Sequence, residues 1–251
     1  MKTLLYTCGY GDVYSVLAEM LMESLWYTGY HGDKLIFTDR DLKPDWSEVI
    51  NVNNHTDRAL LCTDKKMTFH QRVGKVPRGF DLDYFTCKYL PGTFVDKEKY
   101  DFILYVDSDI LFNPVDIDEI FLNKNIVTEY HGWKIFTNLK ALQGVLSEDE
   151  IPQCKSIQSF SGAAIGVPKR HYDFYDKYRD IYLQTISMTP HDQPALNLCL
   201  FRNLNIYNPS RLENRKYWRH YWGKNKEPMF EEYRKRNYAV KPTSAHLKIN
   251  T

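Results

Sequence analysis

The chain has 251 residues, enough for one large α/β domain or two small ones, and we expect a single domain over 1–251. Its 33 basic and 32 acidic side chains give a formal charge of +1, which excludes a global field for nucleic acid or for an anionic membrane. The five cysteines are scattered and form no C-x-x-C pair, which argues against a disulfide framework or a zinc cluster and favours a reducing compartment.

The first half reads as strands interleaved with helices. An apolar run at 3–7 ends in Cys8-Gly9-Tyr10-Gly11, and apolar residues then recur at helical spacing over 13–25. A second short run at 34–38 stops at Asp39, and the polar region 51–81 has no clear period. The strongest strand signal, 102–106, leads directly into Asp107-Ser108-Asp109.

The second half adds another buried strand and two helices. Residues 159–167 are apolar and small, residues 174–185 have helical spacing, and a further helix is predicted from Asp192 to Phe201. The whole pattern predicts an α/β fold with a mostly parallel, Rossmann-like central sheet and helices on both faces. Ligands of such sheets bind beyond the carboxyl ends of the strands, where Thr7–Gly11, Asp39 and Asp107–Asp109 would converge.

The two aspartates of Asp107-Ser108-Asp109 are the main candidates for chemistry. In an extended segment their side chains share one face, where two carboxylates repel unless they share a proton or bind a cation. Mg²⁺ and Mn²⁺ favour carboxylate oxygens together with substrate phosphates. The alternative is that one aspartate caps a turn before Asn113-Pro114 and the other is solvated.

Four segments together resemble a known family. Val106–Phe112 resembles the D-x-D strand of glycosyltransferases with the GT-A fold. Residues 11–14, Ser161-Gly162 and 191–197 are similar, in the same order, to the nucleotide turn, the donor-sugar strand and the D-Q-x-x-L-N segment of glycosyltransferase family 8, the group that includes glycogenin and bacterial galactosyltransferases.

The resemblance implies a GT-A domain with a nucleotide-binding half, 1–112, and a donor-sugar and acceptor half, 113–251. It implies a nucleotide-sugar donor, UDP-linked in our expectation, a carbohydrate or glycoconjugate acceptor, a Mn²⁺ (or Mg²⁺) cofactor and retention of anomeric configuration.

The resemblance also assigns residues to the metal, the nucleotide and the sugar. The metal ligands would be Asp107, Asp109 and His246. The donor sugar would meet Ser161 and Gly162, with Asp192 and Gln193 as the catalytic pair. The nucleotide would be bound by Thr7, Cys8, Gly9, Tyr14, Lys88, Asp107, Ser108 and Lys248. In the family's usual form glycine and then Lys-Pro-Trp follow the histidine, and neither follows His246.

Several of these residues have ordinary structural alternatives. Asp192, with Pro194 behind it, suits a helix N-cap. Lys88 could be a solvated loop lysine, Tyr14 could pack on the first helix, and a lone histidine such as His246 is often a packed or surface residue. The aromatic and basic segment 215–222 could contact an acceptor or a membrane surface, or simply pack.

Other functions remain open at this stage. A dehalogenase-type phosphatase also places Asp-x-Asp after a strand, but near the N-terminus. A sugar nucleotidyltransferase would need a basic glycine-rich loop, and Cys8–Asp12 contains no cation. A non-catalytic nucleotide-sugar or glycan-binding module is the alternative from another class. No apolar stretch reaches the ~18 residues of a spanning helix or forms a signal-peptide core, so we expect a soluble, cytoplasmic protein.

Overall fold

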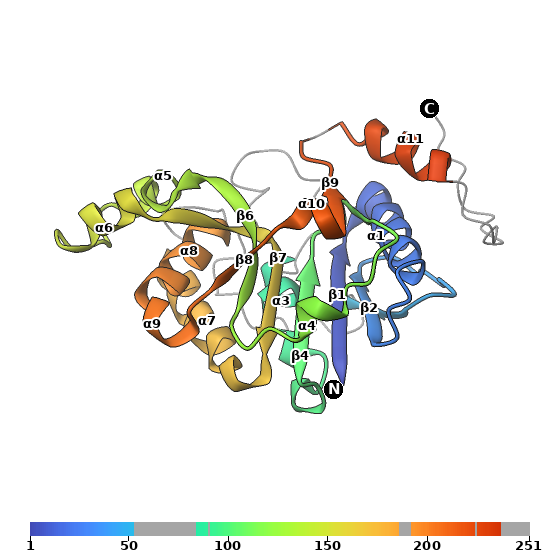
Figure 1. The fold of residues 1–251 in the computed structure, drawn as a ribbon, viewed down its shortest axis with the longest axis horizontal. Helices are drawn as coiled ribbons and strands as arrows, with labels where there is room; N and C mark the ends of the chain where they lie inside the picture. The colour runs from blue at the N-terminus through green and yellow to red at the C-terminus, as the bar shows by residue number, and fades with distance from the viewer. Residues whose placement is uncertain (53–83, 90, 186–191, 224, 237–251) are drawn as a thin grey trace.

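A computed structural model describes residues 1–52, 84–89, 91–185, 192–223 and 225–236. Most of the polar region 51–81, together with His191, His246 and Lys248, lies outside these ranges. The centre of the fold is a seven-stranded sheet in the order β3-β2-β1-β4-β7-β6-β8 (Figure 1). Its strands are β1 (Thr3–Gly9), β2 (Asp33–Thr38), β3 (Glu48–Asn51), β4 (Phe102–Val106), β6 (Val127–Lys134), β7 (Gln158–Pro168) and β8 (Ser210–Leu212).

The sheet is mainly parallel, as the sequence predicts. The pairs β1–β2, β2–β3, β1–β4 and β6–β8 are parallel, whereas β7 runs antiparallel to both β4 and β6. A separate two-stranded ribbon joins β5 (Ile110–Phe112) to β9 (Trp218–His220). This ribbon extends from the carboxyl end of β4, at the end of the sheet opposite the N-terminus (Figure 1).

Helices connect the strands and extend the fold at its margins. The α-helices are α1 (Gly11–Trp26), α3 (Tyr84–Tyr89), α4 (Asp118–Phe121), α5 (Ile135–Leu139), α6 (Glu150–Ser156), α7 (Asp173–Thr185), α8 (Asp192–Arg202), α9 (Leu204–Tyr207), α10 (Asn214–Tyr217) and α11 (Glu227–Arg236). Short 3₁₀ helices are η2 (Pro91–Thr93), η3 (Lys97–Lys99), η4 (Lys140–Leu142) and η5 (Lys169–His171). Within the described ranges, none of the helices combines the length and the apolar character needed to cross a bilayer.

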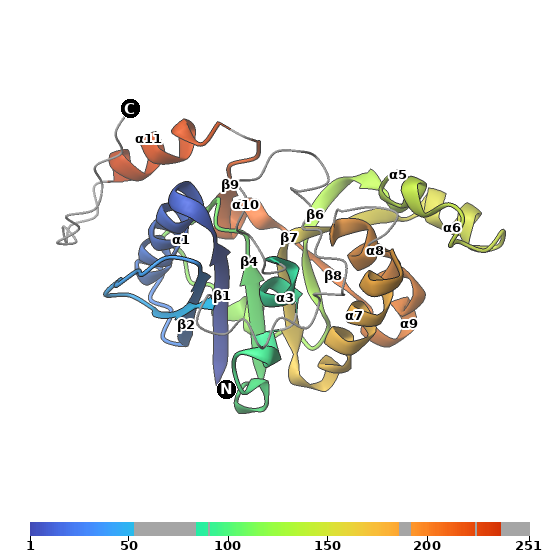
Figure 2. The same ribbon diagram turned by 180° about the vertical axis from the view of Figure 1, so that it is seen from behind.

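Both faces of the sheet are covered, which confirms the predicted layers. Side chains alternate along β1, so Leu4 and Tyr6 pack in a cluster with α3, α7 and α8, whereas Leu5 packs with α1, α4 and the β5–β9 ribbon. The two views show α1 on one side of the sheet and α7 and α8 on the other (Figures 1 and 2). Many of the aromatic side chains pack within these two clusters. Tyr89 and Tyr178, for example, are stacked with ring centroids 4.1 Å apart.

The turn from β1 into α1 depends on two glycines. A Cβ on Gly9 would lie 2.5 Å from the carbonyl oxygen of Tyr14, so only glycine lets the helix approach the strand this closely. Gly11 has a φ of +69°, in the left-handed region that favours glycine. Its N–H donates to Oδ1 of Asp39, at 2.8 Å, so the ends of β1 and β2 are tied together.

The segment 215–222 divides between the core and the surface: its two tyrosines and Trp218 are buried, whereas its arginines, its lysine and Trp222 are exposed. Trp218 is 1% exposed, so the suggestion that it contacts an acceptor or a membrane is wrong, and the ordinary packing alternative holds for it. The pairing of β9 with β5 explains the burial of Trp218, because it packs this side chain against residues of α1, α4 and β5. Trp222 is 59% exposed and is the one tryptophan of the segment that an acceptor or a membrane could reach. The four described cysteines, Cys8, Cys87, Cys154 and Cys199, are buried, and no disulfide joins any two of them.

Candidate active site

The Asp107-Ser108-Asp109 triplet forms the turn between β4 and β5 at the carboxyl end of the sheet. The predicted extended geometry is therefore replaced by a turn that two neighbouring strands hold in place. The Asp107 N–H donates to the carbonyl of Ala163 in β7, at 2.7 Å, and the Asp109 carbonyl accepts from Tyr221, at 2.9 Å. Ser108 is buried, while both aspartates stay partly accessible.

Three possible metal ligands meet at this turn. One ligand atom each of Asp107, Asp109 and His220 lies within 4.8 Å of the others. His220 comes from β9, whose register places it opposite Ile110, the residue after Asp109. Two carboxylates and an imidazole suit Mn²⁺, and the carboxylates also suit Mg²⁺.

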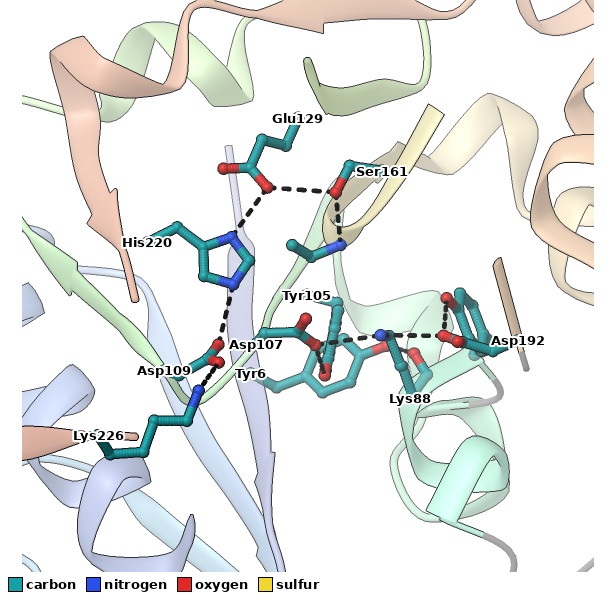
Figure 3. A network of polar contacts seen from close by, with 12 residues as sticks. Tyr6, Lys88, Tyr105, Asp107, Asp109, Glu129, Ser161, Asp192, His220 and Lys226 are labelled. Carbon is teal, nitrogen blue, oxygen red and sulfur yellow. Dashed lines mark hydrogen bonds and ion pairs between the residues drawn. The ribbon is translucent and has the colours of Figure 1, made fainter. Parts of the chain in front are cut away.

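His220 lies between two acidic residues (Figure 3). Its Nε2 is 3.0 Å from Oδ1 of Asp109 and its Nδ1 is 3.2 Å from Oε2 of Glu129. Burial lowers the pKa of His220, but the hydrogen bonds to Asp109 and Glu129 outweigh burial and raise it to about 9. Trp222 covers the imidazole, with ring centroids 3.7 Å apart.

The two aspartates differ in their electrostatic surroundings. Burial alone would raise the pKa of Asp109, but His220 and Lys226 lower it below its ordinary value. Burial raises the pKa of Asp107 despite the nearby Lys88, and the charge of Asp109 adds to the rise. Both carboxylates thus have basic neighbours, Lys88 at Asp107 and His220 and Lys226 at Asp109. Negative charge gathered in this way is what a cation site requires.

Lys88 joins the aspartate turn to the start of α8 (Figure 3). Its Nζ lies 3.0 Å from Oδ1 of Asp107 and 3.0 Å from Oδ2 of Asp192, and the side chain is only 6% exposed. The Tyr89 hydroxyl donates to the same oxygen of Asp192, at 2.6 Å, and Tyr105 donates to Asp107, at 2.5 Å. The predicted solvated-loop alternative for Lys88 is therefore wrong.

Asp192 is the first described residue of α8, and its carboxylate faces this site. Burial would raise its pKa, but Lys88 and the Tyr89 hydrogen bond lower it, so the carboxylate stays ionised. Gln193 donates from Nε2 to the Phe160 carbonyl in β7, at 3.3 Å. The Asn197 side chain accepts from the N–H of Phe160 and donates to its carbonyl, and these two hydrogen bonds fix α8 on β7.

Gly162 allows these groups to approach β7. A Cβ at this position would lie 2.7 Å from the Tyr89 hydroxyl and within 3.5 Å of both Asp192 and Lys88. Its neighbour Ser161 is buried, and its hydroxyl donates to Glu129, at 3.2 Å. A ligand at this strand would therefore contact the backbone of Gly162 more readily than the side chain of Ser161.

The predicted nucleotide residues of β1 point into the core. Thr7 and Cys8 are fully buried, so their side chains do not face the carboxyl edge, and Gly9 ends the strand. Tyr14 is 44% exposed on α1, and its ring centroid lies 5.8 Å from Nζ of Lys226. Of this predicted group, Tyr14 has the side chain that is open to a ligand beside Asp109.

The family resemblance implies His246 as the histidine ligand of the metal and Lys248 as the lysine that contacts the nucleotide. Both residues lie outside the described ranges. The structure instead places His220 and Lys226 at Asp109, where Lys226 donates to Oδ2. A signal was present: Gly223 and Lys226 follow His220 in the order that the family resemblance asks for, glycine and then lysine. Glu129 and Tyr89 carried no such signal.

The chain was also compared with known proteins. No family model matches the chain, and no curated protein gives a significant match. Among solved structures, mouse xyloside xylosyltransferase 1 in its apo form aligns with a TM-score of 0.53 and 12% identity, over 85% of this chain and 86% of that chain. The glycosyltransferase GlyE of Streptococcus pneumoniae TIGR4 aligns with a TM-score of 0.46 and 17% identity, over 86% of this chain.

The fold of this chain is thus a glycosyltransferase fold, which the xylosyltransferase shares over most of its length. The chain spans 46% of GlyE. The narrower likeness to family 8 stays a prediction from the sequence segments.

Proposed function

We propose that the protein is a metal-dependent glycosyltransferase that moves a sugar from a UDP-linked donor to a carbohydrate or glycoconjugate acceptor with retention of configuration. The observation that carries the proposal is the meeting of Asp107, Asp109 and His220 at the carboxyl edge of the sheet. This edge is where α/β sheets bind ligands. The fold that the chain shares with the xylosyltransferase supports the proposal by analogy of architecture only.

The residues at the turn fit a divalent cation and a diphosphate. Asp107, Asp109 and His220 would hold Mn²⁺ or Mg²⁺, which when bound would neutralise the diphosphate as the nucleoside diphosphate leaves. Lys226 and Lys88 flank the carboxylates and would add positive charge to the same leaving group. Tyr14, exposed beside Lys226, would stack on the nucleoside.

The other half of the site would hold the sugar. Asp192 is kept ionised by Lys88 and Tyr89, so it can accept hydrogen bonds from sugar hydroxyls. Both donors bind Oδ2 of Asp192 and hold its carboxylate in place. We therefore assign Asp192 to sugar positioning, with Gln193 beside it near the anomeric carbon, and assign no covalent nucleophile.

Thermal unfolding with Mn²⁺ and a series of UDP- and GDP-sugars tests the donor. A ligand that binds only the folded state at 100 times its Kd stabilises it by about 2.7 kcal/mol, so the true donor raises the melting temperature only when Mn²⁺ is present. An Asp109→Asn variant should lose this rise, whereas Asp118→Asn, at an exposed position of α4, should keep it. A full rise in Asp109→Asn would contradict the metal site.

Slow hydrolysis of the donor separates an enzyme from a binding module. With Mn²⁺, the wild-type protein should release UDP from its donor without an acceptor, and Asp109→Asn should not. Binding without any UDP release or transfer would favour the non-catalytic alternative. The anomeric configuration of the transferred sugar, measured by proton NMR, then tests retention.

A further inference from the structure

Glu129 is a buried acid whose contacts point to the metal ligands. It lies in β6 and is 0% exposed, which is uncommon for glutamate unless its charge is matched. Three side chains converge on it: Nδ1 of His220 at 3.2 Å, the Ser161 hydroxyl at 3.2 Å and Nε1 of Trp218 at 3.4 Å. Its carboxylate is thus fixed from β7 and β9 together (Figure 3).

A register shift in the sheet directs Glu129 to this position. Thr128 in β6 is paired with Ile165 in β7, but the next residue, Glu129, is paired with Ser161. Irregularities of this kind re-aim side chains and are common beside functional sites. On its other edge β7 pairs regularly with β4, and the Ala163 carbonyl continues this ladder by accepting from the N–H of Asp107. Strand β7 therefore contacts the aspartate turn on one edge and the acid behind His220 on the other.

We propose that Glu129 is a positioning residue that holds His220 as a metal ligand. The inference rests on the proposed metal site and deepens it. With Nδ1–H donated to Glu129, the imidazole presents Nε2 toward Asp109, where the cation would bind. A carboxylate behind a ligating histidine fixes the tautomer and ring orientation and makes the nitrogen a stronger ligand.

The charge of Glu129 also favours a divalent cation over other occupants of Nε2. A proton on Nε2 competes with the metal, and Glu129 stabilises both. The metal ion carries twice the charge at nearly the same place, so the negative field favours it more. Glu129→Gln keeps the shape and an acceptor oxygen for Nδ1–H but removes this charge, which makes it the appropriate variant.

Titration of the protein with Mn²⁺, followed by the electron paramagnetic resonance signal of free Mn²⁺, measures affinity without turnover. We expect Glu129→Gln to weaken Mn²⁺ binding by about 10- to 100-fold, the usual effect of removing an outer carboxylate. Glu23→Gln is the matched control, because Glu23 is also a buried acid, 4% exposed, but its hydroxyl donor is Tyr233 rather than a metal ligand. Its Mn²⁺ affinity should equal that of wild type.

Two further measurements separate positioning from a merely structural role. Pulsed spectra of bound Mn²⁺ should show imidazole nitrogen coupling in wild type, no coupling in His220→Ala, and reduced coupling in Glu129→Gln. If Glu129→Gln does not fold, Ser161→Ala removes one donor to the same carboxylate and should weaken Mn²⁺ binding at least threefold.

The outcomes distinguish this inference from the function on which it rests. Unchanged Mn²⁺ affinity and nitrogen coupling in Glu129→Gln, or unchanged affinity in Ser161→Ala where that variant replaces it, overturn the role of Glu129 and leave the metal site intact. Absence of Mn²⁺ binding by the wild-type protein, with and without UDP, overturns the metal site and the positioning role together.

Discussion

The imidazole of His220 lies 3.0 Å from the carboxylate of Asp109, although the two residues come from distant parts of the chain. The β5–β9 pairing creates this contact, because it sets Ile110 opposite His220. The proposed metal site thus depends on a ribbon of two three-residue strands outside the main sheet, and the proposed donor-sugar side depends on the approach of α3 and α8 to β7.

The first prediction concerns Lys88. Lys88→Met removes the cation between Asp107 and Asp192, and loss of one partner from a buried ion pair typically costs about 3 kcal/mol. We expect a lower melting temperature without metal, a smaller decrease with Mn²⁺ and UDP, and at least tenfold weaker donor binding. Calorimetric titration with the donor measures the last effect.

The control for Lys88 is Lys124→Met, which removes an exposed lysine from the loop before β6. It should change neither stability nor donor affinity. Donor affinity of Lys88→Met equal to that of wild type would show that the lysine has a purely structural role.

A second prediction tests how Asp192 is held. Tyr89→Phe removes the hydroxyl at 2.6 Å from Asp192 but keeps the ring stacked on Tyr178. A hydrogen bond to a charged group contributes about 1.5–3 kcal/mol, so we expect kcat to fall roughly tenfold or more with the fold retained. Steady-state kinetics and circular dichroism check the two parts.

Tyr172→Phe is the comparison for Tyr89→Phe, since the Tyr172 hydroxyl donates to the Tyr100 carbonyl and not to an aspartate of the site. It should lose some stability and keep kcat. Equal kcat in Tyr89→Phe and wild type would remove Tyr89 from sugar positioning.

A third prediction concerns pH and the contact between α6 and α8. Arg202 donates to Glu150 and lowers the pKa of that carboxyl below its ordinary value of 4.5. A lowered pKa in the folded state gives stability that is present above pH 4.5 and is lost as pH falls through the folded value. Arg202→Met should therefore cost about 1 kcal/mol at pH 7, because the pair is partly exposed, and less at pH 3.

Urea unfolding at both pH values measures the effect of Arg202→Met. Lys134→Met is the reference, because the Lys134 ammonium donates to the Ser156 carbonyl, which does not titrate, and its contribution should not depend on pH over this range. A cost of Arg202→Met that is the same at pH 3 and pH 7 would assign it to the Val145 carbonyl contact instead of Glu150.

Local patterns were sufficient to predict several of the larger elements, but not β6 or α11. The apolar run 102–106 is β4 with the same limits, helical spacing located α1 and α7, and the helix predicted from Asp192 to Phe201 is α8, which is buried throughout Pro194–Phe201. The ends of β1 and β2 do meet, through Gly11 and Asp39, as the strand pattern predicts. Lys88 and Asp192 also meet the aspartate turn, but they come from α3 and α8, and strand order alone does not bring them there.

Most of the remaining contacts of the site are encoded by no local pattern. β5 and β9 have three residues each, too few for a hydrophobic period, so their pairing could not be predicted, although the order His220, Gly223, Lys226 was a signal for the partner of Asp109. Glu129 follows Ile126, Val127 and Thr128, and nothing in this sequence indicates that its carboxylate is buried; the register shift against β7 pairs it with Ser161. Trp218 looked like a surface ring because basic residues surround it, but ribbon pairing buries it.

The last prediction concerns Gly162, where the backbone comes closest to the donor-sugar side. A methyl group there would lie 2.7 Å from the Tyr89 hydroxyl, on a side chain that is stacked and buried and has little room to move. Gly162→Ala should therefore displace Asp192 and Lys88 and reduce transfer at least 100-fold, while Mn²⁺ binding at Asp109 and His220 persists. Gly144→Ala, with open space around its Cβ, should leave both unchanged. Transfer at the wild-type rate in Gly162→Ala would mean that the sugar is held elsewhere than between β7 and α8.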